Sequence, residues 1–234
     1  MSENSSSHPT QIRLSDHIVE TIRVNENFLL DHAKDTIEEV VELINDAIDI
    51  VGHAVDRPEN KKDYLERSMA FFIYHVLMPS SYAIYLDLIA ANLPVCFIEL
   101  RLLLESLVKC YLADLRHSDQ SFFQERLKSL EKSERNISKL MRELGKDIGV
   151  GDEFVDLWSE LSEDWVHTRG VASKVVTHVI ERADIPPWAL VVPMNFVQSD
   201  LDTLNELSKQ ISRFRSLLKI STEKYKQELG FSQT

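Results

Sequence analysis

The most constraining feature of this sequence is an apolar stretch that carries regularly spaced charges. Residues 93–115 read LPVCFIELRLLLESLVKCYLADL, in which Glu99, Arg101, Glu105 and Lys109 interrupt a run of leucines. Ionisable groups such as these are costly in a lipid bilayer, so the stretch is not typical of a membrane span. Its length and composition predict a helix that is surrounded by other helices in a bundle.

The composition favours helices throughout. Six glycines and seven prolines in 234 residues suit long helices better than a fold of strands and turns. We therefore predict an all-α fold, a single-domain helical bundle of five to seven helices with long N- and C-terminal helices. We expect a disordered tail at 1–14 and the bundle domain at 15–230. Helices are predicted at 16–53, 61–91, 93–115, 118–147 (with a restart at Ser133), 152–167 and 195–229.

Local patterns add detail to these helices. Apolar positions recur in steps of three and four from Ile18 to Val51, which predicts one uninterrupted first helix. Pro79 is expected to kink or split the second helix, and Asn92 to cap the third. The segment 171–192 stays open, because its valines suit either a helix or a strand. A stripe of apolar residues at helical spacing is expected to face the core: Phe154, Trp158, Leu161 and Trp165.

The location of the protein is also open to prediction. Residues 68–86 carry no formal charge and reach the minimum length of a membrane span. Pro79 and several serines and tyrosines interrupt them, so we expect a core helix and no membrane association. Cys96 and Cys110 would lie roughly 21 Å apart on one helix, which is too far for a disulfide. Free buried thiols are typical of a reducing compartment, and we predict a cytoplasmic protein.

The sequence lacks the common signatures of cofactor binding and catalysis. There is no H-E-x-x-H, no cysteine pair at zinc spacing, no phosphate-binding glycine loop and no G-x-S-x-G. The run from Asp164 to His167 is a carboxylate variant of the di-iron E-x-x-H motif. We expect no metal and no cofactor. The net charge of −12 also disfavours nucleic acid as a partner.

The charges of residues 93–115 are the best candidate site. Arg101, Glu105 and Lys109 are spaced four residues apart and share one stripe, whereas Glu99 lies on another face. In one interpretation they are the wet edge of a buried helix, paired along its surface. In the other, Arg101 and Glu105 line a cavity with His167 and the neighbouring Asp164, and together these four residues form a catalytic or ligand-binding site.

Two short motifs carry a resemblance. L-R-x-L-L-E-S at 100–106, followed by W-x-x-L-S-x-x-x-x-H at 158–167, resembles a family of uncharacterised prokaryotic all-helical proteins. More loosely, the chain is similar to HEPN-type helical domains, many of which are metal-independent RNases of toxin–antitoxin and antiviral systems. Active members carry R-x(4–6)-H on one helix, which does not occur here. Arg101 and His167 would have to be brought together by tertiary folding.

Two functions from different classes follow. The first is a non-enzymatic or catalytically degenerate helical module that binds an unknown protein or small molecule. The second is a HEPN-like RNase, in which His167 is the acid or base and Arg101 holds phosphate. The exposed length of the terminal helices also predicts a homo-oligomer, most simply a homodimer.

Overall fold

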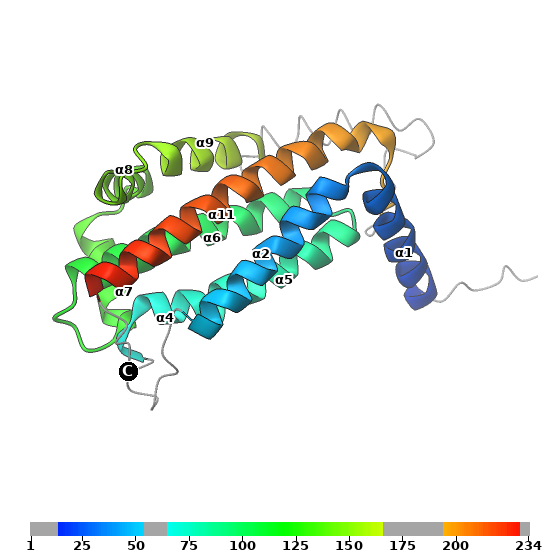
Figure 1. The fold of residues 1–234 in the computed structure, drawn as a ribbon. Coiled ribbons are helices and arrows are strands. Elements are labelled where there is room, and N and C mark those ends of the chain that lie inside the picture. The colour runs from blue at the N-terminus through cyan, green and yellow to red at the C-terminus, as the bar shows by residue number, and fades with distance from the viewer. Residues whose placement is uncertain (1–13, 54–64, 166–193, 230–234) are drawn as a thin grey trace, which may run out of the picture.

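The structure, a computed structural model, describes residues 14–53, 65–165 and 194–229. The prediction of an all-α, single-domain helical bundle is confirmed. With the continuous segment Ser68–Ile89 counted as one helix, the three described ranges contain eight helices and no strand, and Figure 1 shows the bundle that they form. The expected first helix divides into two, which accounts for a helix more than predicted. The open segment 171–192 lies outside these ranges.

The central helix is α6, Leu93–Arg116, whose ends agree with the prediction to within one residue. Pro94 lies in its first turn, where the missing N–H removes no helical hydrogen bond. Most of its side chains are buried, as expected for a helix with neighbours on several sides. Asn92 is the N-cap residue as predicted, but its side chain donates to Asp87 Oδ1 at 2.9 Å and makes no capping bond to α6.

The prediction of one helix over 16–53 is wrong at Ala33. Helix α1 is Leu14–His32 and α2 is Lys34–His53, and the buried Ala33 belongs to neither. Figure 1 shows α1 turned away from the axis of α2 at one end of the bundle. The apolar repeat continues across the break, so the sequence pattern contains no sign of it.

A buried asparagine holds α1 in this direction. Asn25 Nδ2 donates to the carbonyl oxygens of Ile89 at 3.0 Å and Met194 at 2.7 Å. Asn25 Oδ1 accepts the backbone N–H of Phe196 at 2.9 Å. These three hydrogen bonds join three segments that are distant in sequence. They also offset the free-energy cost of burying the polar side chain of Asn25, which is fully buried.

The second predicted helix is continuous from Ser68 to Ile89, with a change of winding. Helix α4, Ser68–Phe72, passes into a π-helical turn, η1 at Ile73–Leu77, and then into α5, Met78–Ile89. The wide turn contains the residue four before Pro79, His75, whose carbonyl the proline ring would crowd in a regular α-helix. Pro79 therefore neither splits nor ends the helix.

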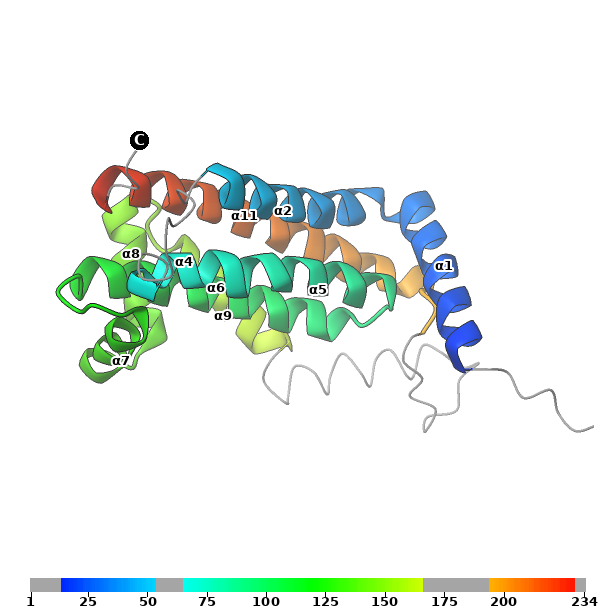
Figure 2. The ribbon, with the colours of Figure 1, turned by 90° about the horizontal axis from the view of Figure 1, so that it is seen from below.

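The apolar composition of Ser68–Ile89 is typical both of a membrane-spanning helix and of a core helix in a bundle. Within the described chain it is the one helix long and apolar enough to cross a membrane, judged by length and composition. A core helix passes the same test, and 44% of its most apolar window is buried in the bundle. In Figure 2 this helix lies beside α6.

Three shorter helices follow α6. Helix α7 is Phe123–Ser133 and α8 is Ile137–Ile148, so the predicted restart near Ser133 is confirmed. Gly149 ends α8 at φ 82°, in the left-handed region that favours glycine. Helix α9, Glu153–Trp165, then runs along α6 and α11 (Figure 1).

The last helix, α11, is Leu201–Leu229, preceded by a single 3₁₀ turn, η2 at Gln198–Asp200. It packs on α6, whereas α2 packs on α11 and α5. Arg215 of α11 fixes the α2 contact with three ion pairs of 2.6–3.3 Å. Its carboxylate partners on α2 are Glu39, Glu42 and Asp46.

Candidate functional site

The charged stripe of α6 forms a compact cluster with a tryptophan of α9. Arg101 Nε donates to Glu105 Oε1 at 2.8 Å, and Trp158 Nε1 donates to the same oxygen at 2.8 Å. The guanidinium carbon of Arg101 lies 5.2 Å from the centroid of the Trp158 ring, within the range of a cation–π contact. We call Arg101, Glu105 and Trp158 the Arg101 cluster.

The cluster is shielded from solvent but not saturated with hydrogen bonds. The side chains of Arg101 and Glu105 are 19% and 24% exposed. Arg101 Nη1 is buried and has no hydrogen-bond partner among the described residues. An unpaired buried donor of this kind costs about 1–3 kcal/mol, more when it is charged. One edge of an oriented guanidinium is therefore left without a partner by the described residues.

The antiparallel packing of α6 and α9 determines which residues of α6 lie beside Trp158. The ring of Trp165 stacks on that of Phe97, with centroids 3.9 Å apart and planes 7° from parallel. One or two turns along, the same packing places Trp158 beside Arg101. The predicted aromatic stripe is confirmed as core, because Phe154, Leu161 and Trp165 are buried. Trp158 is partly buried, and its indole N–H gives it a polar role that the stripe did not indicate.

The other predicted site residues divide into two groups. Lys109 continues the stripe of Arg101 and makes no ion pair with any described residue. Glu99 is outside the cluster, and its Oε2 is buried without a hydrogen-bond partner in the described chain. The side chain of Asp164 and all of His167 lie outside the described residues. Arg101 and Glu105 are thus brought together, and their convergence with His167 stays a prediction.

A second polar centre, at Asp114, was not predicted. Its carboxylate accepts the backbone N–H groups of Ser68 at 2.8 Å and Met69 at 2.9 Å, which caps the start of α4. Arg126 Nη1 donates to it at 3.0 Å and Tyr225 Oη at 2.8 Å. Asp114 is 1% exposed, and all four donors come from within the chain. This saturated carboxylate is a structural junction.

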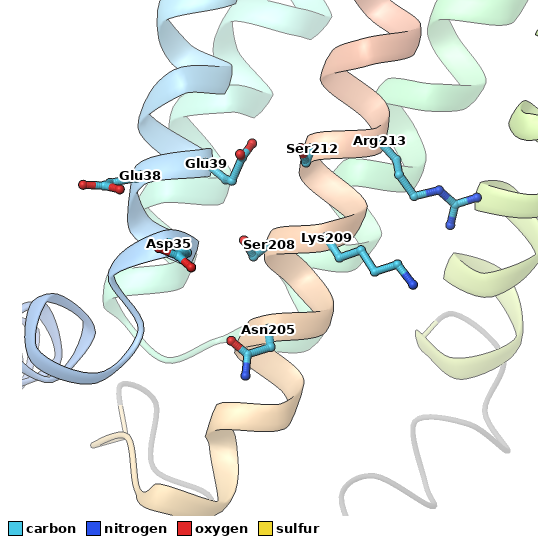
Figure 3. Close-up of a pocket in the computed structure, with 8 residues that line it drawn as sticks. All are labelled: Asp35, Glu38, Glu39, Asn205, Ser208, Lys209, Ser212 and Arg213. Carbon is cyan, nitrogen blue, oxygen red and sulfur yellow. The ribbon is translucent and has the colours of Figure 1, made fainter.

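A groove of about 520 Å³ lies between α2 and α11, and Figure 3 shows the residues that line it. Ser208 and Ser212 are turned toward α2, whereas Lys209 and Arg213 extend from the opposite side of α11 toward α9. Arg213 is engaged there, by Glu160 at 2.7 Å and Glu153 at 3.1 Å. The groove wall on α2 is acidic, with Asp35, Glu38 and Glu39. Neither Arg101 nor Glu105 lines it.

The described residues contain no group of three His, Cys, Asp or Glu side chains that could hold a metal ion. Both cysteines are buried free thiols, as predicted. Burial raises the pKa of Cys96 and of Cys110 well above the usual value for a thiol, and nearby carboxylates raise each further. Neither thiol has the properties of a nucleophile.

The Arg101 cluster is the described feature best suited to binding. A guanidinium held at Nε by a carboxylate and on one face by an indole presents its remaining N–H groups in a fixed direction. Such an arrangement suits a carboxylate or phosphate group. Comparisons of the chain with family models, with curated proteins and with solved structures found no match.

Proposed function

We propose that this protein is a non-enzymatic helical module that binds a small oxyanion, or an anionic group of a partner protein, at the Arg101 cluster. The observation that carries this proposal is the buried Arg101 Nη1 without a partner among the described residues. A ligand oxygen at this position supplies the missing acceptor. The ligand also adds negative charge beside Arg101. Glu105 supplies only part of that charge, because its Oε1 accepts hydrogen bonds from both Arg101 and the indole N–H of Trp158.

The energetic reasoning separates this site from an ordinary surface pair. An exposed Arg–Glu pair at i, i+4 contributes about 0.3–0.5 kcal/mol and needs no further partner. Arg101 and Glu105 are largely shielded, so each unpaired N–H is costly and each added acceptor correspondingly favourable. Trp158 restricts the guanidinium to one plane, which lowers the entropy lost when a ligand binds.

An RNase of HEPN-like type is the second candidate. One observation favours it: Trp165, two residues before His167, stacks on Phe97, one helical turn from Arg101 on α6. This proposal assigns Arg101 to an RNA phosphate and His167 to proton transfer. It requires that His167 reach the Arg101 cluster, directly or from a second copy of the chain.

The binding proposal is tested by titration with inorganic phosphate and with citrate, followed by thermal unfolding and by the indole N–H signal of Trp158. We expect each anion to raise the melting temperature and to shift this signal. Arg101→Gln should weaken the effect about tenfold, because it removes a charge-assisted contact. Arg116→Gln is the matched control, since Arg116 is 26% exposed and already paired with Glu143.

Two results would contradict the binding proposal. One is an equal response of the Arg101→Gln and Arg116→Gln variants to both anions. The other is cleavage of single-stranded RNA in the presence of a chelator, abolished by His167→Ala. The second result would establish the RNase in its place.

A further inference from the structure

Two neighbouring helices leave large apolar side chains in solvent. On α5, Tyr82 and Leu86 are 45% and 61% exposed, and on α6, Ile98 and Leu102 are 44% and 47% exposed. Each pair is spaced four residues apart, so both members lie on one face of their helix. Single exposed apolar residues are ordinary, whereas contiguous ones mark interaction surfaces.

The two helices that carry these pairs pack side by side. Helices α5 and α6 are antiparallel and joined by a tight turn, in which the N–H of Asn92 donates to Asp87 O at 2.8 Å. Further along, Cys96 Sγ lies 3.6 Å from Ile84 O, and Figure 2 shows the helices side by side. We call the surface formed by Tyr82, Leu86, Ile98 and Leu102 the α5–α6 face.

This face is the neutral part of an acidic molecule. Asp87 is the one formally charged residue between positions 68 and 98, whereas the chain carries a net charge of −12. Two copies that approach through acidic surfaces, such as the outer side of α2, repel each other. Two copies that meet through a neutral apolar face avoid this repulsion and remove apolar area from water. Two copies of this acidic chain can therefore meet through this face without charge repulsion.

A row along α6 adds two unused charges of opposite sign. Val95, Glu99, Leu102, Ser106 and Lys109 follow each other in steps of 4-3-4-3, the heptad spacing of helices that pack in pairs. Glu99 Oε2 is buried without a partner, and Lys109 makes no ion pair, within the residues that the structure describes. Neither side chain is therefore paired within the described part of a single chain.

We propose that the α5–α6 face binds a second copy of this chain, with the two α6 helices antiparallel about a two-fold axis. An antiparallel register centred near residue 104 places Glu99 opposite Lys109 of the other copy. The symmetry axis repeats this ion pair, as an isologous interface requires. Leu102 lies near the symmetry axis, Ile98 lies just beyond Glu99 on the same helix, and Tyr82 and Leu86 extend the apolar surface on α5.

A lipid surface is the competing occupant, because Ser68–Ile89 is apolar enough to enter one. Lipid leaves Glu99 and Lys109 without partners in an apolar medium, which is costly. A second copy pairs them. The proposal is independent of the Arg101 cluster, so ligand binding and self-association can be lost separately.

The test is the mass of the full-length chain in solution, measured by light scattering and by sedimentation over a range of concentrations. We expect twice the chain mass of 27.0 kDa. Ile98→Glu should weaken association about tenfold or more, because it buries an unpaired charge in the apolar part of the interface. Ile48→Glu is the matched control: Ile48 is 45% exposed on α2, outside the α5–α6 face, and this variant should associate like the unmodified protein.

The register is tested separately by charge reversal. Glu99→Lys or Lys109→Glu alone should weaken the dimer, and the double variant should restore it. A monomer at every concentration would overturn the proposal, as would equal association of Ile98→Glu and Ile48→Glu. A monomer that floats with vesicles of phosphatidylcholine would overturn it in favour of lipid. If the charge-reversed double variant dissociates more than either single variant, the pairing of Glu99 with Lys109 is wrong.

Discussion

Asp114 illustrates what a single residue decides in this fold. It follows Leu107 and Tyr111 at steps of four and three, so its side chain belongs to the buried stripe of α6. A carboxylate on that stripe needs several donors to offset desolvation. Two of them are free N–H groups at the start of α4, and the others are Arg126 and Tyr225. A charged residue in register with buried leucines is the signal by which sequence inspection could have found this junction.

Tyr225 gives the junction a pH dependence. Burial raises the pKa of Tyr225 above the usual value, and the charge of Asp114 with its hydrogen bond raises it further. The unfolded chain loses this proton near pH 10, whereas the folded chain keeps it. The folded state then binds more protons, so the stabilising contribution is complete below pH 10 and declines as the pH rises above it.

We therefore predict that Tyr225→Phe flattens the alkaline decline of stability. The slope lost should approach about 1.4 kcal/mol per pH unit for this one group, measured by urea unfolding between about pH 9 and 11. At neutral pH the variant should lose about 0.5–1.5 kcal/mol through the missing hydrogen bond. Tyr82→Phe, at an exposed position, is the control. Parallel pH profiles for Tyr225→Phe and the unmodified protein would refute the prediction.

At the scale of elements, the direction of α1 depends on contacts and not on helix propensity. The apolar repeat of 16–53 passes through Ala33 without a glycine or proline. A straight continuation would separate Asn25 from Ile89 and from the backbone around Met194 and Phe196. Three hydrogen bonds to Asn25 favour the break instead. The cost of interrupting a helix at one residue is small beside three buried bonds.

Asn25→Ala should accordingly destabilise the protein by about 1–3 kcal/mol, because it leaves buried backbone groups unpaired. Urea unfolding measures this change. Limited proteolysis should also show faster cleavage near Ala33 as α1 loosens. Asn27→Ala removes the same side chain from an exposed position of α1 and should change stability by less than about 0.5 kcal/mol. Similar losses for both variants would show that the bonds of Asn25 do not hold α1.

At the scale of the whole molecule, one apolar core extends from end to end of the bundle. Cys96 lies near the turn between α5 and α6, and Cys110 lies four turns further along α6. Both are buried in the same continuous cluster of apolar side chains. Helices α2, α5, α9 and α11 all contribute to this cluster. Opening either end of the bundle thus means exposing part of a shared core.

This arrangement predicts that the two thiols become reactive together. In native protein at pH 8, a thiol reagent such as dithionitrobenzoate should label neither cysteine over hours, because both are buried and the pKa of each thiol is raised. In increasing urea, both should react in step with the loss of helical circular dichroism. Cys96→Ser and Cys110→Ser variants assign the signals. Labelling of one thiol well before global unfolding would show that the two ends of the bundle open independently.

The reach of sequence-based prediction differs between parts of the candidate site. Arg101 and Glu105 pair as neighbours on one helix, which their spacing of four residues predicts. Trp158 was predicted on the buried stripe of α9. Its hydrogen bond to Glu105, however, spans 53 positions and depends on how α9 is positioned along the axis of α6. The convergence with Asp164 and His167 stays a prediction, because His167 and the side chain of Asp164 lie outside the described residues.

The sequence by itself determined the all-α class, the limits of α6 and the core-facing stripe of α9. Each follows from the local 3.6-residue period with which side chains alternate between core and water. The break at Ala33, the junction at Asp114 and the unused edge of Arg101 were decided by the tertiary structure alone. Each of them depends on donors and acceptors that are distant in sequence, and only the packing of whole helices determines which of these groups meet.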